Sequence, residues 1–458
     1  MKIKNPLGMK YNDLILPDNT FVVKMKTPSV IANPAITIAN ALEHPIDCDP
    51  LSVVASKKLE VKRNATACVV VSDNTRPVPY RGEEGILLPI IETLLKVGYQ
   101  KENILILVAT GTHRVMMDDE LKKMIDSRIF SMGIKIVNHD CDDDANLVYK
   151  GVTSRGTHMY LDKRYVEADL KIATGLVESH FMAGASGGRK AICPGLIGKA
   201  STYVFHGPAF MADPNSRDLN LEGNPVHEES LEVASTIGVD FLVNVTLDQN
   251  FHVTGIFCGA LNTAHLAAVE MIKKTVRTPV PHEADIVITH GGFVGINHYQ
   301  CAKCGVASLG VLKENGYLVV IANLTDKGNV VGSINYRTTV ALLKLQGADG
   351  YVRTISSPDW TFIPEQWQVQ MWAKVFKKIP MDHMLFYAPQ LNTLMWQGLP
   401  GVNAALFVGD NPGSDCFSKA VSGAISYIEK KENEKVSDLN IIYIPEGPYV
   451  VPYVQGMD

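Results

Sequence analysis

Short runs of apolar, β-branched residues alternate along this chain with longer segments of helical apolar spacing, and this alternation limits its fold more than any other feature. Ala67–Val71 (ACVVV) has the composition of a buried strand, and Glu83–Val97 follows it with helical spacing. Further strands are predicted at Asn103–Ala109, Lys135–Val137 and Leu170–Thr174. Strands that alternate with helices pair in parallel through right-handed crossovers. The sequence therefore predicts an α/β fold, with mainly parallel sheets flanked by helices.

The alternation is interrupted between Thr275 and Glu283 (TVRTPVPHE), where two prolines follow the helical run Ala260–Lys274. It then restarts, so we expect a domain at 1–275, a linker at 276–284 and a second α/β domain at 285–458. The elements predicted for the second domain are strands at 285–289, 317–322, 384–387 and 440–444, the last of them final, and helices at 299–314 and 364–376.

Composition narrows the class of protein. Hydrophobic residues make up 46 % and charged residues 20 % of the 458 residues, which is the balance of a globular protein with a substantial core. A formal charge of -5 gives no general electrostatic reason to bind nucleic acid or anionic lipid. The chain shows neither a membrane span nor a signal peptide, and its 8 cysteines do not form a disulfide scaffold. We expect a cytoplasmic protein without nucleic-acid or membrane partners.

Ligands of parallel sheets bind beyond the carboxyl ends of the strands, so the loops there are the places to search. Asp73 and Arg76 follow the first predicted strand, and an arginine there is suited to clamp a carboxylate or phosphate. An ordinary turn explains the same residues equally well. After the next strand, His113 follows Gly111 on a turn, which makes this histidine a candidate for acid–base work.

The richest loop is Glu178–Lys190 (ESHFMAGASGGRK), with glycines at 184, 187 and 188. Backbone N–H groups of such a loop can cradle an anion. The cation Arg189 beside Lys190 favours a neutral, nucleophilic amine, so covalent attachment of a group to Lys190 is chemically reasonable. A basic surface loop is the alternative interpretation.

Two further sets of residues carry potential chemistry. His206 follows an apolar run, and with His113 and His180 it makes a three-histidine zinc site an open alternative. In the second domain, Gln300 and Lys303 lie three residues apart on one face of a helix start, where an amide and an ammonium could hold a carboxylate.

Taken together, the motifs DNTRP, GTHR, SHFMAGASGGRK with a downstream VFH, and YQCAK resemble those of the nickel-pincer lactate racemase family, in the same order and over most of the chain. The resemblance implies a two-domain α/β enzyme with its active site between the domains. Domain 1–275 would bind the cofactor and carry catalysis, and domain 285–458 would contribute substrate contacts. It also implies a pyridinium-3-thioamide-5-thiocarboxylate mononucleotide whose sulfur-containing arms grip nickel.

The resemblance assigns a role to each matching position. Lys190 matches the lysine that holds the cofactor through a thioamide, and His206 matches the nickel ligand. His113 and His180 match the two acid–base histidines. The remaining expected site residues are Asp73, Gly187 and Gly188 for the cofactor, and Arg76, Gln300, Lys303 and the pocket aromatic Trp367 for the substrate.

The chemistry agrees with this assignment. Removing the α-proton of a 2-hydroxy acid anion gives a prohibitive dianion, whereas removing hydride gives a keto acid. Inversion then needs an electron-accepting cofactor and one base for each enantiomer. We expect a racemase or epimerase of a lactate-like 2-hydroxy acid that meets cofactor-biosynthesis proteins transiently. The alternatives are the same chemistry on a longer sugar acid or dicarboxylate, a three-histidine zinc hydrolase, and a non-catalytic nucleotide-binding module.

Overall fold

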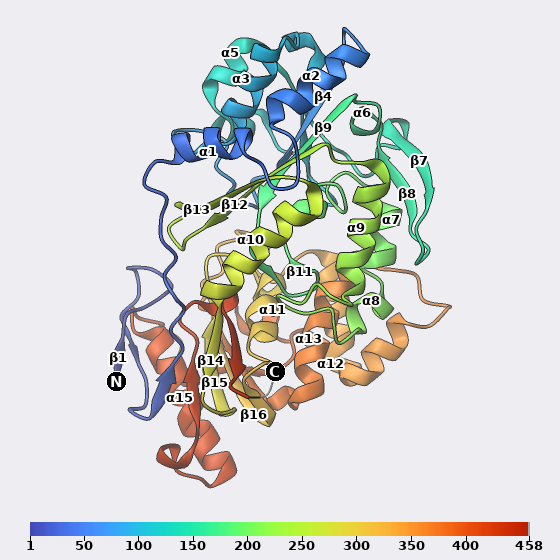
Figure 1. Cartoon of the computed structure of the whole chain (residues 1–458). Helices are drawn as coiled ribbons and strands as arrows, with labels where there is room; N and C mark the ends of the chain where they lie inside the picture. Colours follow the sequence, from blue (N-terminus) through green and yellow to red (C-terminus); the bar gives the residue numbers. More distant parts are fainter. Residues whose placement is uncertain (457–458) are drawn as a thin grey trace. The chain divides into compact units, whose positions relative to one another are not determined.

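A computed structural model describes residues 1–456, in which the chain forms two compact units (Figure 1). The N-terminal unit comprises Thr27–His206 and Pro214–Thr275, and the C-terminal unit comprises Met1–Lys26, Gly207–Asp213 and the chain from Val276 onward. The last two residues, which the predicted domain 285–458 included, lie outside the described residues.

The grouping of the chain's first 26 residues differs from the predicted domain 1–275. They belong to the C-terminal unit because β3 (Thr20–Val22) pairs in parallel with β19 (Ile441–Tyr443). The chain passes between the units after Thr275, where the pattern breaks. The predicted linker 276–284 contains a strand of its own, β14 (Arg277–Val280).

The N-terminal unit is built on a six-stranded sheet of order β13-β12-β9-β4-β5-β6, in which only β13 is antiparallel to its neighbour. This confirms the predicted mainly parallel α/β fold. The strands are β4 (Ala67–Ser72), β5 (Ile104–Ala109), β6 (Lys135–Asn138), β9 (Leu170–Leu176), β12 (Phe241–Leu247) and β13 (Val253–Gly259).

Alternate residues of these strands and one group of helices form the core of the unit. Val69 and Val71 of β4 are fully buried in the same cluster as Ile90 and Leu94 of α3 (Leu87–Val97). Full burial of each such side chain stabilises the fold by about 1.5–3 kcal/mol. The other helices in this cluster are α1 (Pro34–Glu43), α2 (Leu51–Val61), α4 (Asp118–Met124) and α5 (Ser127–Met132).

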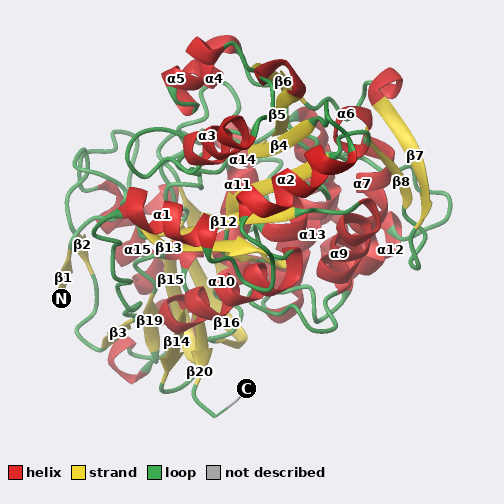
Figure 2. Cartoon of the chain, turned by 45° about the horizontal axis from the view of Figure 1, so that its top comes forward, coloured by secondary structure: helices red, strands yellow, loops and turns green. Residues whose placement is uncertain are grey.

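The second half of the N-terminal unit adds helices and two small ribbons, of which the hairpin β7–β8 is prominent in Figure 2. The ribbon strands are β7 (Leu147–Val152) with β8 (His158–Asp162), and β10 (Ser179–His180) with β11 (Gly184–Ala185). The helices are α6 (Lys163–Val166), α7 (Lys199–Phe205), α9 (Pro225–Ile237) and α10 (Leu261–Val276).

The C-terminal unit contains an all-parallel sheet of order β18-β17-β16-β15-β19-β3. Its strands besides β3 and β19 are β15 (Ala284–His290), β16 (Leu312–Ile321), β17 (Met384–Tyr387) and β18 (Val402–Asn403). Its helices are α8 (Pro208–Ala212), α11 (His298–Ala307), α12 (Ile334–Ile355), α13 (Gln366–Lys378), α14 (Thr393–Trp396) and α15 (Cys416–Glu432).

Two predicted elements of this unit were wrong in their bounds or order. The helix predicted at 299–314 ends at Ala307, because Leu312 already pairs with Ala284 as the first residue of β16. The strand predicted as final is followed by β20 (Val451–Val454), which pairs in parallel with β14. Pro452 inside this short strand hid it from a pattern-based search. Within residues 1–456, no helix is both long and apolar enough to cross a membrane.

Candidate active site

Three neighbouring strands of the N-terminal sheet deliver the predicted loops to one edge. β4 lies between β5 and β9, all three are parallel, and the last residues of β4 and β5, Ser72 and Ala109, are paired in register. Asp73 and Arg76 follow β4, and His113 follows β5. The glycine-rich segment 178–190 follows β9. The carboxyl ends of adjacent strands therefore position these loops as the alternation predicted.

Asp73 and His113 form a carboxylate–imidazole pair. His113 Nδ1 lies 2.7 Å from Asp73 Oδ2, and Oδ1 of the same carboxylate accepts hydrogen bonds from the N–H and hydroxyl of Thr75 at 3.1 and 2.5 Å. Asp73 is buried, at 4 % exposure, whereas the His113 side chain is half exposed. Burial alone would raise the pKa of Asp73, but His113, Thr75 and Arg76 lower it below its ordinary value.

This pairing decides which nitrogen of His113 is available. An ionised carboxylate only accepts hydrogen bonds, so Nδ1–H donates to Asp73 and the neutral ring carries its lone pair on Nε2. The two loops are also tied by Glu120, which binds Arg114 through two hydrogen bonds of 2.8 and 2.6 Å and accepts one from Asn74 at 3.2 Å. His113 thus stands on a braced turn with the orientation of its ring fixed.

The guanidinium of Arg76 connects this pair of loops with the glycine-rich loop. Its Nη1 donates to the carbonyl of Thr75 at 3.2 Å, and its Nε forms an ion pair with Glu178 at 3.4 Å. Both side chains of the ion pair are partly exposed. The arginine proposed from sequence as a carboxylate clamp is therefore already placed beside one carboxylate of the chain.

His180 and Lys190 lie together in the glycine-rich loop. His180 Nδ1 accepts the N–H groups of Met182 and Ala183 at 3.3 and 3.2 Å, and Nε2 lies 3.2 Å from Lys190 Nζ. Because Nδ1 acts as an acceptor, the proton of the neutral ring is on Nε2, where it faces the amine. The loop thus brings one predicted acid–base residue into contact with the predicted attachment site.

The glycines of this loop are required by close packing. Gly187 and Gly188 have φ of 74° and 53°, and a Cβ on Gly188 would lie 2.6 Å from the ring of His265. The N–H of Gly188 donates to Asn244 Oδ1 at 2.9 Å. These contacts hold the loop against β12 and α10, and the predicted cofactor contacts of Gly187 and Gly188 stay predictions.

Arg189 is buried beneath the glycine-rich loop and forms hydrogen bonds that stabilise it. It is 1 % exposed, its Nη2 donates to the carbonyl of Ala183 at 2.7 Å, and its Nη1 lies 3.0 Å from His265 Nε2. Burial lowers the pKa of Arg189 to about 9. Its guanidinium therefore serves the loop's own structure.

His206 ends α7 and is half-buried. Its Nδ1–H donates to the carbonyl of Thr202 at 3.1 Å, which leaves the lone pair on Nε2. Burial, followed by the positive charge of Lys190, lowers the pKa of His206 to about 3. A neutral imidazole is the form that binds nickel, so this donor fits a metal-carrying group attached at Lys190.

The three predicted substrate residues of the C-terminal unit lie on two packed helices. Gln300 and Lys303 are on α11, which follows the central strand β15, and Trp367 is on α13. Gln368 of α13 donates to the carbonyl of Tyr299 at 2.8 Å, and Trp367 stacks on Phe362 with centroids 5.9 Å apart. Within residues 1–456 the buried amide oxygen of Gln300 has no hydrogen-bond partner.

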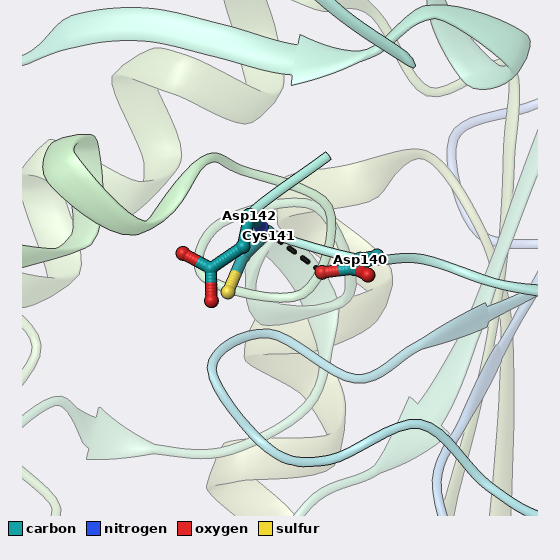
Figure 3. A group of neighbouring side chains, drawn as sticks. All are labelled: Asp140, Cys141 and Asp142. Carbon is teal, nitrogen blue, oxygen red and sulfur yellow. Dashed lines mark hydrogen bonds between the residues drawn. The ribbon is translucent and has the colours of Figure 1, made fainter. Parts of the chain in front are cut away.

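The three-histidine zinc alternative is not supported. Among residues 1–456, the only His, Cys, Asp and Glu side chains that gather closely enough to hold a metal are Asp140, Cys141 and Asp142 (Figure 3). That group is a turn in which Asp140 accepts the N–H of Asp142 at 3.0 Å, and Asp142 pairs with Lys199. His113, His180 and His206 form no such cluster.

Sequence reasoning missed three residues that shape the site. Glu178 pairs with Arg76, Asn244 holds Gly188, and His265 contacts Arg189. Asp73 was predicted to bind the cofactor, and its contact with His113 was not foreseen. Each contact joins residues far apart in the chain, so no local spacing signals it.

Comparison with known proteins indicates one family. The profile of the lactate racemase N-terminal domain matches residues 7–218. The lactate racemase of Lactiplantibacillus plantarum is 32 % identical over 352 residues, which cover 76 % of this chain and 78 % of that protein. The lactate racemase of Thermoanaerobacterium thermosaccharolyticum is 31 % identical over 379 residues, covering 81 % of this chain and 85 % of the relative.

Solved structures agree as well. The lactate racemase apoprotein of T. thermosaccharolyticum superposes with a TM-score of 0.83 at 26 % identity, covering 99 % of this chain and 100 % of that one. A crystal structure of a protein from Thermotoga maritima shares the fold at a TM-score of 0.60 and 15 % identity, covering 89 % and 98 % of the two chains.

These findings define an α/β enzyme of the isomerase class, a racemase. The chain belongs to the lactate racemase family, which confirms the resemblance drawn from its motifs.

Proposed function

We propose that this enzyme racemises lactate with a nickel-pincer nucleotide bound covalently to Lys190. The single observation that carries the proposal is that the loops at one edge of the N-terminal sheet hold two histidine pairs, Asp73–His113 and His180–Lys190. His206 adds a neutral imidazole whose pKa responds to the charge of Lys190. The relatives named lactate racemase support lactate as the substrate.

Lys190 and His206 would hold the cofactor. Lys190 offers the amine for attachment, and its Nζ lies 3.2 Å from His180 Nε2. His206 offers the lone pair on Nε2 to nickel. When bound, the cofactor supplies a hydride acceptor, because no side chain accepts hydride.

The chain's own residues move the hydroxyl proton. His113 takes the proton of one enantiomer at Nε2, and Asp73 stabilises the resulting imidazolium through Nδ1–H. His180 would take the proton of the other enantiomer at Nε2, which requires the ring to shift its own proton to Nδ1 once Lys190 carries the cofactor. Because the reverse of each step serves the mirror image, each histidine is the base for one enantiomer and the acid for the other.

Holding the substrate requires a cation for its carboxylate. Arg76 is proposed for this contact because a guanidinium binds a carboxylate through two parallel hydrogen bonds. Lys303, Gln300 and Trp367 are proposed as further substrate-binding residues from the family resemblance. We also propose that the protein acts in the cytoplasm and meets the cofactor-biosynthesis proteins transiently during loading.

The test is to produce the protein together with the cofactor-biosynthesis proteins and to examine it by peptide mass spectrometry and by racemisation from pure D- and L-lactate. We expect added mass on the peptide that contains Lys190. We also expect the same equimolar mixture of D- and L-lactate from either pure enantiomer. Lys190→Ala should lose both, whereas Lys199→Ala, at a surface lysine paired with Asp142, should keep both. An adduct on another residue would refute the attachment site.

His206→Ala separates attachment from metal binding. We expect the adduct on Lys190 to persist while nickel is lost, because a single imidazole completes the coordination that the cofactor mostly supplies. Elemental analysis of the purified variant measures this directly. Full nickel occupancy would assign the ligand to another residue.

A further inference from the structure

The backbone of Glu178 is held in place by hydrogen bonds, and its side chain contacts Arg76. Its N–H donates to the Ser186 hydroxyl at 3.0 Å, and its carbonyl accepts the N–H of Ser186 at 2.9 Å. Both sides of the Glu178 backbone are therefore pinned to the glycine-rich loop. From this fixed point the side chain reaches Nε of Arg76, which follows the adjacent strand β4.

Arg76 is also held in place by hydrogen bonds. The N–H of Arg76 donates to the carbonyl of Asp73 at 3.2 Å, and its carbonyl accepts the N–H of Val78 at 2.8 Å. Nε faces Glu178 at 3.4 Å, and Nη1 donates to the carbonyl of Thr75 at 3.2 Å. Among residues 1–456, Nη2 of Arg76 has no hydrogen-bond partner. All four contacts of this arginine thus hold it in place, and the Nη2 end of its planar guanidinium is left for a ligand.

We propose that Glu178 is a positioning residue that holds the Arg76 guanidinium ready for the substrate carboxylate, an inference that rests on the proposed function. An arginine side chain has several rotatable bonds, and ordering it on binding costs affinity unless it is ordered beforehand. Glu178 provides that order from the Nε side. It also repels a substrate carboxylate from that side and leaves the Nη2 end as the place for it.

A competing interpretation makes the opposite prediction. If Glu178 merely occupied the place of the substrate carboxylate, removing it would free the clamp and strengthen substrate binding. The two interpretations therefore differ in the sign of the change in KM. Glu178→Gln adds a second distinction, because an amide oxygen can still face Nε while the negative charge is gone.

The experiment uses the cofactor-loaded enzyme and measures kcat and KM for D- and L-lactate. Glu178→Ala should raise KM by roughly 10- to 100-fold with kcat within a few-fold, since misplaced binding groups cost factors of this size. Glu178→Gln should restore most of the loss. Glu167→Ala, at an exposed glutamate paired with Lys163, should match the unmodified enzyme. An unchanged or lowered KM in Glu178→Ala would overturn the proposal.

A double-substitution cycle with Arg76→Ala locates the effect. If Glu178 acts through Arg76, Glu178→Ala should change KM little once Arg76 is already alanine. Full additivity would mean that Glu178 acts elsewhere. If Arg76→Ala by itself left KM unchanged, the failure would belong to the proposed carboxylate clamp and hence to the proposed function.

A second measurement needs neither cofactor nor lactate. Phenylglyoxal modifies accessible guanidinium groups, and peptide mass spectrometry reports its rate at Arg76. In the apoprotein we expect Glu178→Ala to speed modification of Arg76 severalfold and to leave Arg155, paired with Glu228 on the surface, unchanged. Equal rates at Arg76 would overturn the positioning role even if lactate proved not to be the substrate.

Discussion

The loop that carries His113 and the glycine-rich loop that carries His180 hold their imidazoles by opposite means. His113 is half exposed and donates Nδ1–H to the buried carboxylate of Asp73. His180 is half-buried, accepts backbone N–H groups at Nδ1 and directs Nε2 toward Lys190. One ring is oriented by a charge and the other by the backbone. The proposed two-base mechanism thus assigns the same kind of group to two different surroundings.

The strongest test of this contrast removes each imidazole in turn. His113→Ala and His180→Ala should each lower racemisation in both directions by about 10²–10⁴-fold, the usual contribution of a general acid–base group. The loss must be equal in both directions, because the equilibrium constant between mirror images is unity.

Single turnovers should then separate the two variants. Each variant should still oxidise one enantiomer, which rapid-mixing spectra of the loaded enzyme report, and should fail with the mirror image. The two preferences should be opposite. If both variants lost the same enantiomer's half-reaction, the contrast between the loops would have no functional meaning and the two-base mechanism would be wrong.

Asp73→Asn tests whether the charge on the first loop matters to His113. We expect kcat/KM to fall by about 10²–10³-fold, because an asparagine neither stabilises the imidazolium nor enforces the Nδ1–H tautomer. The matched control is Asp248→Asn, since Asp248 contacts His252 Nδ1 at 3.2 Å on an exposed turn. Unchanged kinetics in Asp73→Asn would show that the pair only supports the fold.

The same substitution has a signature in stability. The folded pKa of Asp73 lies below its ordinary value, so its stabilisation is complete above about pH 4 and is lost as pH falls through the folded pKa. Asp73→Asn should therefore reduce the loss of stability at acid pH. Urea unfolding of the apoprotein at several pH values measures this.

The contrast between the loops also shows what the sequence reveals. The strands β4, β5 and β9 were predictable because their apolar runs are continuous, and the polar residues that follow them mark the loops. The motifs around His180 and Lys190 indicated the family. The pairings Asp73–His113 and Arg76–Glu178 were not predictable, because they depend on which strands are neighbours in the sheet.

Pairings between distant parts of the chain were also not predictable in the fold. β3 has only three residues and no periodicity, so nothing in Thr20–Val22 indicates its pairing with β19 near the other end of the chain. Gly188 was predicted to contact the cofactor, and that contact stays a prediction, because the structure shows its N–H bonded to Asn244 and a Cβ position that would meet His265. A glycine-rich segment signals close approach, but the sequence does not say whether a ligand or the protein approaches.

Gly188→Ala should damage the second loop more than Gly111→Ala damages the first. Both glycines have positive φ, but an added Cβ meets the ring of His265 at 2.6 Å in one case and the carbonyl of Pro194 at 3.3 Å in the other. We expect losses in the free energy of unfolding of about 2–4 and 1–2 kcal/mol. Gly133→Ala, at φ 74° with no neighbour within 4 Å, isolates the backbone cost. Equal losses at Gly188 and Gly133 would remove the packing argument.

Arg76→Lys tests the ion pair between Arg76, which follows β4, and Glu178 of the glycine-rich loop. A lysine keeps the positive charge beside Glu178 but replaces a planar fork with a point donor, so it cannot bind a carboxylate through two parallel hydrogen bonds. We expect kcat/KM to fall roughly 10- to 150-fold. This corresponds to a loss of about 1.5–3 kcal/mol in transition-state stabilisation, the range for hydrogen bonds to charged groups. Arg155→Lys, at the surface pair with Glu228, should leave kcat/KM unchanged. Since the charge is conserved, a fall specific to position 76 would have to come from the geometry of the donor. Unchanged kcat/KM would refute a clamp that depends on two parallel hydrogen bonds from position 76.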